Sequence, residues 1–285
     1  MAETKTILVT GATGQQGGAV AAELLSHGFT VHAMTRKPES DKARELAKRG
    51  ARIITGDLDN PASLEAALKG VWGVFAVQNT WEAGVEKEEE QGKRIATLAR
   101  KAGVHHFVYT SVASAHRKTG IPHFDNKYRV EETVQGLGFP SYTIIRPVFF
   151  MENLASPWFK PAIDQGNLMV ALKPSTSLQM IAVQDIGKYG LWAFQNRENL
   201  NGRAFDIASD SLTMPETAKA LSAVAGRTIG FVPVPIGEVR KMSEDYALML
   251  EWFDRVGYDA DIPAMAKESG IKPTSFAQWA PTVKW

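Results

Sequence analysis

The chain has 285 residues, enough for one large domain or for a large and a small one, and enough to bury a core without disulfides. Hydrophobic residues make up 44% and charged residues 22%, a balance that excludes a disordered chain. The formal net charge of +1 gives no overall field to attract nucleic acid, and the absence of cysteine excludes disulfides and thiolate metal sites.

Short β-branched runs alternate with helical patterns through the first half of the chain. The predicted strands cover 6–10, 30–34, 51–55, 73–77, 106–110 and 142–146, and the predicted helices cover about 19–25, 39–49, 61–69, 84–102 and 126–137. Several of these helices end at a glycine, which is a typical C-terminal signal. The repeated strand–helix–strand order predicts a parallel sheet with helices on both faces, that is, a doubly wound α/β Rossmann domain.

The alternation weakens after Pro147, where further prolines divide the chain into short pieces. Later patterns predict an amphipathic helix, a helix with a capping box, a strand and a last helix, at 183–194, 213–226, 229–234 and 238–256. We expect residues 1–155 to form the Rossmann domain and residues 156–285 a smaller mixed region over the substrate, with some segments returning to the sheet. The acidic run at 86–90 is expected on a solvated helix face.

A glycine-rich segment lies between the first predicted strand and the first predicted helix. Its glycines allow a sharp turn, a close approach of the backbone to a pyrophosphate, and close packing of the helix on the sheet. Free N–H groups at the start of the helix favour phosphate there. We interpret the segment as a dinucleotide-binding loop, and the alternative is a structural glycine turn. The candidate cofactor-binding residues are Gly11, Thr13, Gly14, Gln15, Gln16 and Gly17.

Arg36 and Lys37 follow the second predicted strand, where an NAD-specific site usually has an acidic residue. A carboxylate would repel the 2′-phosphate of NADP(H), whereas a guanidinium can bind it through two hydrogen bonds. Arg36, with Lys37 as an additional charge, therefore predicts NADP(H), and the alternative is a solvated basic turn. After the third strand, Asp57 and Leu58 are placed to lie beside the adenine, unless Asp57 or Asp59 is a helix N-cap.

Seven segments of the first half occur together in an order typical of one family. They are Val9–Gly18, Thr35–Lys37, Gly56–Asp57, Val74–Gln78, Phe107–Ser111, His123–Lys127 and Ile145–Asn153. They resemble the NmrA-like family, an atypical branch of the short-chain dehydrogenase/reductase superfamily. The resemblance covers roughly the first 155 residues, and it implies a Rossmann domain, bound NADP(H) and a substrate cleft beside the C-terminal part. Family members include reductases of quinones and related carbonyl or enone compounds, and also regulators that bind the nucleotide without known catalysis.

Reductases of the wider superfamily use a Tyr-x-x-x-Lys pair near a Ser or Thr. The resemblance assigns the lysine to Lys127, which would hold the nicotinamide ribose, and the serine to Ser111, but the tyrosine position holds His123. An imidazole keeps a usable protonated fraction near neutral pH, so His123 is a candidate acid. The alternatives are a structural loop histidine and a solvated lysine in the first turn of a helix.

Further candidate contacts lie where open α/β sheets bind ligands, at the carboxyl edge of the strands. Val77 and Gln78 end the fourth predicted strand. Phe149, with Phe150 and Met151, leaves the sixth strand and would form an apolar wall over the nicotinamide, suited to a flat hydrophobic substrate; the alternative is packing between the two parts of the chain. The histidines show no metal-ligand spacing, so we expect no metal.

These patterns together predict an NADP(H)-dependent reductase of a small apolar carbonyl, enone or quinone. The alternative is a non-catalytic NADP(H) sensor that regulates a protein partner, which the missing tyrosine favours. No nucleic-acid partner is expected from the net charge of +1. No apolar run reaches the length of a membrane span and no signal peptide is evident, so we expect a soluble cytoplasmic protein.

Overall fold

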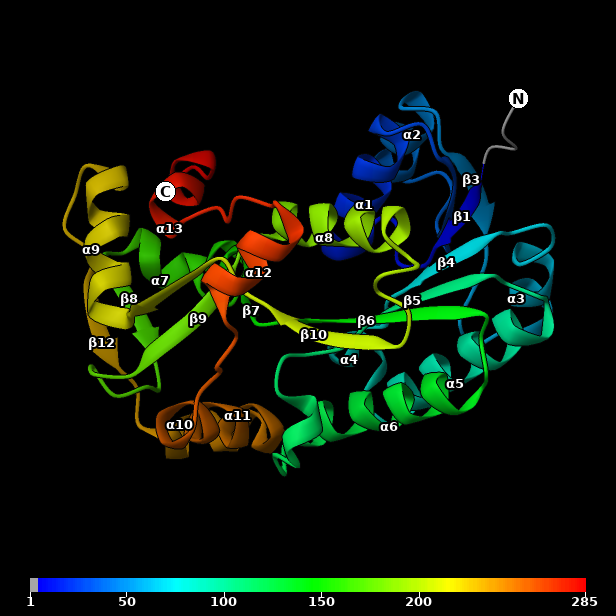
Figure 1. Cartoon of the computed structure of the whole chain (residues 1–285). Coiled ribbons are helices and arrows are strands. Elements are labelled where there is room, and N and C mark those ends of the chain that lie inside the picture. The colour runs from blue at the N-terminus through cyan, green and yellow to red at the C-terminus, as the bar shows by residue number, and fades with distance from the viewer. Residues whose placement is uncertain (1–4) are drawn as a thin grey trace.

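The computed structural model describes residues 5–285 and contains a large parallel sheet with a smaller mixed part beside it (Figure 1). The large sheet has seven strands in the order β10-β6-β5-β4-β1-β2-β3, and every neighbouring pair is parallel. The strands are β1 (Thr6–Val9), β2 (Thr30–Thr35), β3 (Arg52–Thr55), β4 (Gly73–Ala76), β5 (His106–Thr110), β6 (Ser141–Pro147) and β10 (Arg203–Ile207). Because the order reverses at β1, the fold is doubly wound, which confirms the predicted fold class.

Helices cover both faces of this sheet, as Figure 1 shows. One face carries α1 (Gln15–Ser26), α2 (Asp41–Lys48) and α8 (Val183–Gln195), and the other carries α3 (Pro61–Ala67), α5 (Val85–Lys101) and α6 (Pro122–Gly136). Two glycines let α8 lie close against α1. A Cβ on Gly187 would come within 2.8 Å of the Ala19 carbonyl oxygen, and one on Gly190 within 2.6 Å of a Val20 methyl group. Both α8 and β10 come from beyond residue 156, so the sheet and its cover draw on both halves of the chain.

The smaller part contains two short sheets. One joins β7 (Phe149–Phe150), β9 (Ser177–Ile181) and β11 (Asp210–Thr213), and the other joins β8 (Asn167–Val170) and β12 (Gly230–Pro233). The helices around them are α7 (Lys160–Asp164), α9 (Met214–Ala225), α10 (Ile236–Met242), α11 (Glu244–Arg255), α12 (Ile262–Ser269) and α13 (Phe276–Trp279), and 3-10 turns cover Ala115–Arg117, Met151–Ala155 and Ala280–Thr282. These elements enclose a core of their own, which includes Met180, Leu221 and Trp252.

Several boundaries differ from the expectations. The predicted capping box is confirmed, since the Thr213 hydroxyl accepts from the Glu216 N–H and the Glu216 carboxylate accepts from the Thr213 N–H. The single helix expected over 238–256 is wrong, because the chain breaks at Ser243, whose hydroxyl caps α11. The long helix α5 continues through Gly92, where a Cβ would lie 2.8 Å from a Val130 methyl group, so this glycine lets α5 and α6 pack closely. Within residues 5–285, no helix combines the length and the apolar character of a membrane span.

Candidate functional site

The glycine-rich loop has the geometry that close approach to a phosphate requires. Gly11 adopts a φ of +56°, in the left-handed region that favours glycine. A Cβ on Gly17 would lie 2.4 Å from the Gly11 carbonyl oxygen, so no larger residue fits there without a shift of the backbone. Gly14 is the N-cap of α1, no side chain caps the helix, and its first turn has no acidic residue. The N–H groups of that turn are therefore available to an anion.

Two threonines join the ends of β1, β4 and β5 at the carboxyl edge of the sheet. The Thr10 hydroxyl donates to the Val77 carbonyl at 2.9 Å and accepts from the Val77 N–H at 2.8 Å. The Thr110 hydroxyl donates to the Gln16 side-chain oxygen at 2.7 Å. Since Ser111 follows Thr110 directly, these bonds bring the glycine loop, Val77 and Ser111 to one edge.

Arg36 lies just past β2 and donates a hydrogen bond to the Glu82 carboxylate. Glu82 belongs to α4 (Thr80–Ala83), a one-turn helix that the sequence did not predict. Both side chains are about half exposed, at 53% and 54%. The hydrogen bond that Arg36 donates to Glu82 raises the pKa of Arg36, burial opposes the shift, and the nearby carboxylates of Asp57 and Asp59 add to it. The Arg36 guanidinium therefore already contacts one carboxylate and interacts through space with two others.

Asp57 and Leu58 follow β3 as expected, but neither aspartate caps the next helix. The Asp57 carboxylate accepts from the Asp59 N–H at 2.9 Å. The side chain of Asn60 caps α3 instead, by accepting from the Ser63 N–H at 3.2 Å. The N-cap interpretation of Asp57 and Asp59 is therefore wrong, and their carboxylates stay near Arg36.

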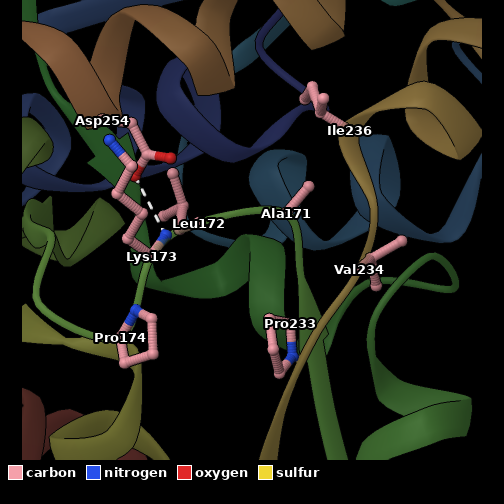
Figure 2. Close-up of a pocket in the computed structure, with 8 residues that line it drawn as sticks. All are labelled: Ala171, Leu172, Lys173, Pro174, Pro233, Val234, Ile236 and Asp254. Atoms are coloured by element: carbon pink, nitrogen blue, oxygen red, sulfur yellow. Dashed lines mark hydrogen bonds between the residues drawn. The ribbon is translucent and has the colours of Figure 1, made fainter.

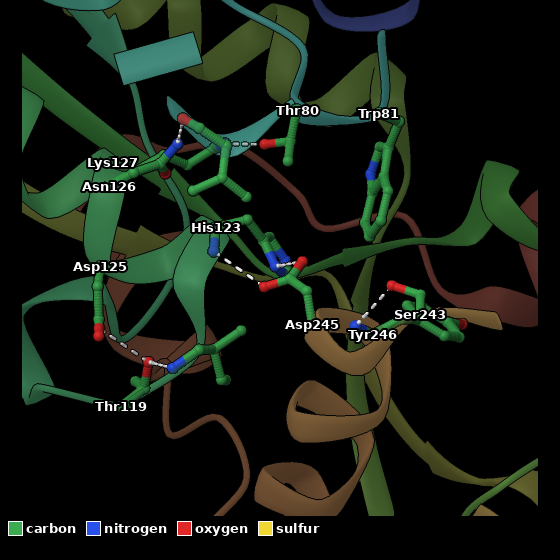
Figure 3. A network of polar contacts seen from close by, with 12 residues as sticks. Thr80, Trp81, Thr119, His123, Asp125, Asn126, Lys127, Ser243, Asp245 and Tyr246 are labelled. Carbon is green, nitrogen blue, oxygen red and sulfur yellow. Dashed lines mark hydrogen bonds and ion pairs between the residues drawn. The ribbon is translucent and has the colours of Figure 1, made fainter. Parts of the chain in front are cut away.

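Lys127 lies within a buried polar network rather than in solvent. Its side chain is 15% exposed and forms an ion pair with Glu88, which is 2% exposed. The Lys127 ammonium also donates to the Thr80 hydroxyl at 3.0 Å (Figure 3). Asn126 donates to Glu88 at 2.9 Å. Burial opposes ionisation of Glu88, but the charge of Lys127 and these hydrogen bonds outweigh it and lower its pKa. The solvated-lysine alternative is wrong, and so is the expectation that residues 86–90 are all solvated.

His123 is in the first turn of α6, because that helix begins at Pro122, earlier than predicted. The expected position in a loop is therefore wrong, but the structural contacts of the alternative are present. Its Nδ1 atom lies 2.5 Å from the Asp245 carboxylate of α11, although not aligned as a hydrogen bond, and its backbone N–H donates to the same carboxylate at 3.0 Å. Burial raises the pKa of Asp245, but the contacts with His123 lower it overall. The Trp81 ring lies 5.3 Å from the imidazole and 6.0 Å from Tyr246 (Figure 3).

Three buried polar atoms near this edge have no hydrogen-bond partner among the described residues. They are Gln78 Nε2, Ser111 Oγ and Asn126 Oδ1. A buried polar group without a partner costs about 1–3 kcal/mol, so such atoms indicate partners that come from outside the chain. Together with the uncapped helix α1 and the guanidinium of Arg36, they fit a polar, anionic ligand that extends along the carboxyl edge.

The aromatic residues beyond β6 differ from the expected wall. Phe150 packs against the core of the large sheet and Phe149 against the core of the smaller part, so the pair bridges the two. Met151 is fully buried in the second core, so its inclusion in an exposed wall is wrong. Tyr109 is 1% exposed, and burial raises its pKa far above the usual range. This tyrosine therefore cannot replace the missing proton donor.

Two cavities lie elsewhere. One of about 270 Å³, between the end of β8 and the start of α10, is lined mainly by apolar residues of the C-terminal part (Figure 2). Asp254 accepts from the Lys173 N–H at its rim. A second cavity of about 350 Å³ lies beside β10 and is lined by His116, Arg146 and Asp206 among others. The predicted site residues do not line either cavity. Among residues 5–285, no group of His, Asp or Glu side chains is arranged to bind a metal ion.

Three charged partners in this site were missed by sequence reasoning. Glu88 had a signal, because it lies at helical spacing with the buried residues Gly92, Ile95 and Ala99 of α5. Glu82 and Asp245 had none, since they are 46 and 122 positions away from the residues they contact.

Comparisons with known proteins agree with this fold. The model of the NmrA-like family matches residues 3–280. An NmrA-like family domain-containing oxidoreductase of Malbranchea aurantiaca is 33% identical over 252 residues, which cover 79% of this chain and 74% of that protein. The solved structure of Nmra, a negative transcriptional regulator in complex with NAD, has a TM-score of 0.83 at 21% identity and covers 98% of this chain and 95% of that one. An NADPH-dependent quinone oxidoreductase of Escherichia coli, in complex with NADPH, has a TM-score of 0.80 at 23% identity, with 97% and 99% covered. Because the family model spans almost the whole chain, this protein belongs to the NmrA-like family.

Proposed function

We propose that this protein binds NADP(H) and reduces a small apolar carbonyl, enone or quinone. The observation that carries the proposal is the position of Arg36 just past β2, at the same edge of the sheet as the uncapped start of α1. One element offers N–H groups to a pyrophosphate, and the other offers a guanidinium to a 2′-phosphate. The names of the Malbranchea relative and of the Escherichia coli structure, an oxidoreductase and an NADPH-dependent quinone oxidoreductase, support this choice.

Lys127 is assigned to the nicotinamide ribose. An ammonium has three N–H donors, and Glu88 and Thr80 accept two of them, which leaves one for a ribose hydroxyl. The ion pair with Glu88 fixes the position of the ammonium. Gln78 Nε2 and Ser111 Oγ are buried polar atoms at the carboxyl edge that have no hydrogen-bond partner among residues 5–285. When bound, NADPH supplies the hydride, and these residues hold its ring at the acceptor.

His123 is assigned to the acceptor oxygen. Its Nδ1 faces Asp245, so the other ring nitrogen, Nε2, is the atom that can reach a substrate. The Asp245 carboxylate beside Nδ1 orients the ring, so that Nε2 can donate a proton as negative charge develops on the acceptor oxygen. Trp81 lies beside the imidazole and is 64% exposed, so it offers an aromatic face to a flat substrate.

The cofactor assignment is tested with Arg36→Ala. If Arg36 binds the 2′-phosphate, wild type should bind NADPH more tightly than NADH by about 1.5–3 kcal/mol, and the variant should lose most of this difference with little change for NADH. Arg44→Ala is the matched control, because Arg44 is also an exposed arginine but lies on α2 and pairs with Asp41. Equal affinities of wild type for the two nucleotides in a calorimetric titration would contradict the assignment.

A second candidate function is a nucleotide sensor without catalysis. It is favoured by His123 in place of the tyrosine and by the burial of Tyr109, and Nmra is named a regulator. The two functions are distinguished by NADPH oxidation over a panel of quinones and enones. Turnover of at least one acceptor supports the reductase, whereas NADPH binding without any turnover supports the sensor.

A further inference from the structure

We propose that Glu82 sets the coenzyme preference of this protein by competing with the 2′-phosphate of NADP(H) for Arg36. The proposal rests on the assignment of Arg36 to that phosphate. In the structure the guanidinium donates to the Glu82 carboxylate, which is an oxyanion like the phosphate and uses the same donors. NADPH must therefore replace a bond that the chain already makes to itself, whereas NADH, which lacks the 2′-phosphate, leaves that bond in place.

The position of Glu82 is set by a short helix that is capped at its start and hydrogen-bonded at its first residue. The Asn79 side chain accepts from the Trp81 N–H at 3.1 Å and caps α4, and Gly84, with a φ of +85°, ends it. Thr80 is 7% exposed and is held by Lys127 and Glu88. The carboxylate of Glu82 is thus positioned beside Arg36 by a one-turn helix whose first residue, Thr80, is held by hydrogen bonds.

The charges around Arg36 explain why Glu82 affects the binding of NADPH more than that of NADH. Asp57 and Asp59 also act on the guanidinium, but through space, and Asp59 is paired with Lys87 at 2.9 Å. Glu82 is the carboxylate in direct contact with Arg36. An incoming phosphate therefore meets a guanidinium whose charge is already balanced, and it brings further negative charge beside Glu82. Neutralising Glu82 removes both the competitor and this repulsion.

The expected size of the effect is modest because the ion pair is half exposed. Exposed pairs of this kind contribute about 0.2–1 kcal/mol, which corresponds to at most about a fivefold change in an equilibrium constant. Glu82→Gln should therefore tighten NADPH binding by up to about fivefold and change NADH binding less than twofold. The gain should shrink as salt rises, because salt screens exposed charges.

The experiment is a calorimetric titration of NADPH and NADH into wild type, Glu82→Gln, Arg36→Ala and the double variant, each checked for an unchanged melting temperature. Glu39→Gln is the matched control, because Glu39 is a nearby acidic residue, 91% exposed, that lies close to Arg44 rather than Arg36. The proposal expects a gain of up to about fivefold for NADPH in Glu82→Gln, none in Glu39→Gln, and no gain from Glu82→Gln when Arg36 is absent.

The outcomes separate this inference from the proposed function. If Arg36→Ala abolishes the preference for NADPH but Glu82→Gln leaves NADPH affinity unchanged or weaker, the competition is refuted and the cofactor assignment stands. If Glu82→Gln tightens NADH as much as NADPH, Glu82 is not specific for the 2′-phosphate and the inference is overturned. If wild type binds NADPH and NADH equally and Arg36→Ala changes neither affinity, the cofactor assignment and the competition by Glu82 are both refuted.

Discussion

Replacing Lys127 by methionine tests how strongly the buried network depends on a single charge. The change keeps most of the length of the side chain and removes the ammonium. Glu88 is then left 2% exposed without its cation, while Thr80 and Asn126 still donate to it. Breaking a buried ion pair by removing one partner costs about 3–5 kcal/mol, because the other charge stays desolvated. Since the Lys127 end is 15% exposed, we expect the lower value, about 3 kcal/mol at pH 7.

The direction in which the free energy of unfolding changes with pH follows from the pKa of Glu88. In wild type the pKa of Glu88 is lowered, so its contribution to stability is present above the ordinary value of 4.5 and is lost as the pH falls through the lowered pKa. In Lys127→Met the burial of Glu88 raises its pKa instead, because the compensating cation is gone. The stability deficit of the variant should therefore be largest at pH 7 and shrink as the pH falls toward 4.5.

Denaturant unfolding at pH 7 and at pH 5 measures both quantities, and a deficit of about 3 kcal/mol corresponds to a melting temperature about 5 °C lower. The control is the double variant Lys127→Met/Glu88→Gln, in which no buried charge remains and most of the stability should return. A double variant as unstable as Lys127→Met, or a deficit that is the same at both pH values, would show that Lys127 does not neutralise Glu88.

Three further predictions concern the loop, the catalytic pair and a buried histidine. Gly17→Ala places a Cβ 2.4 Å from the Gly11 carbonyl oxygen, so we expect NADPH affinity to fall more than tenfold with a lower melting temperature, by calorimetry and thermal unfolding. His123→Phe should leave NADPH binding intact and lower the single-turnover reduction rate roughly 100-fold; an unchanged rate would mean that water supplies the proton. Burial lowers the pKa of His106 from 6.5 to about 4, so the unfolded state binds more protons between these values and stability should fall by roughly 3 kcal/mol as the pH drops through them. His106→Gln should flatten this part of the pH–stability curve.

The sequence predicted those parts of the fold that local patterns determine. Each of the first five strands is a short apolar run followed along the chain by a helix, so its existence depends on neighbouring residues. The place of β10 beside β6 was not predictable in this way, because that pairing joins segments on either side of the C-terminal elements β7 to β9. The split of the last helix at Ser243 was missed because the amphipathic pattern continues across it.

The same distinction holds for the candidate site. The glycine loop, Arg36 and the pair His123 and Lys127 follow from short motifs and their spacing. The charges that face them do not, because Glu82 and Asp245 reach their partners only through the folded chain. Sequence reasoning therefore identified the groups that we assign to a ligand, whereas the charged residues that contact them could be found only in the structure.

The glycines of α8 have a consequence for any attempt to cut this protein in two. Gly187 and Gly190 let α8 lie against α1, the helix whose first turn forms the glycine loop, and β10 covers the edge of β6. A fragment that ends near residue 155 would retain every motif of the dinucleotide site but would expose the apolar side of α1 and an unpaired strand edge. The nucleotide-binding half is therefore completed by the chain that follows it, and chimeras that exchange acceptor-binding segments need to keep α8 and β10 with the N-terminal half.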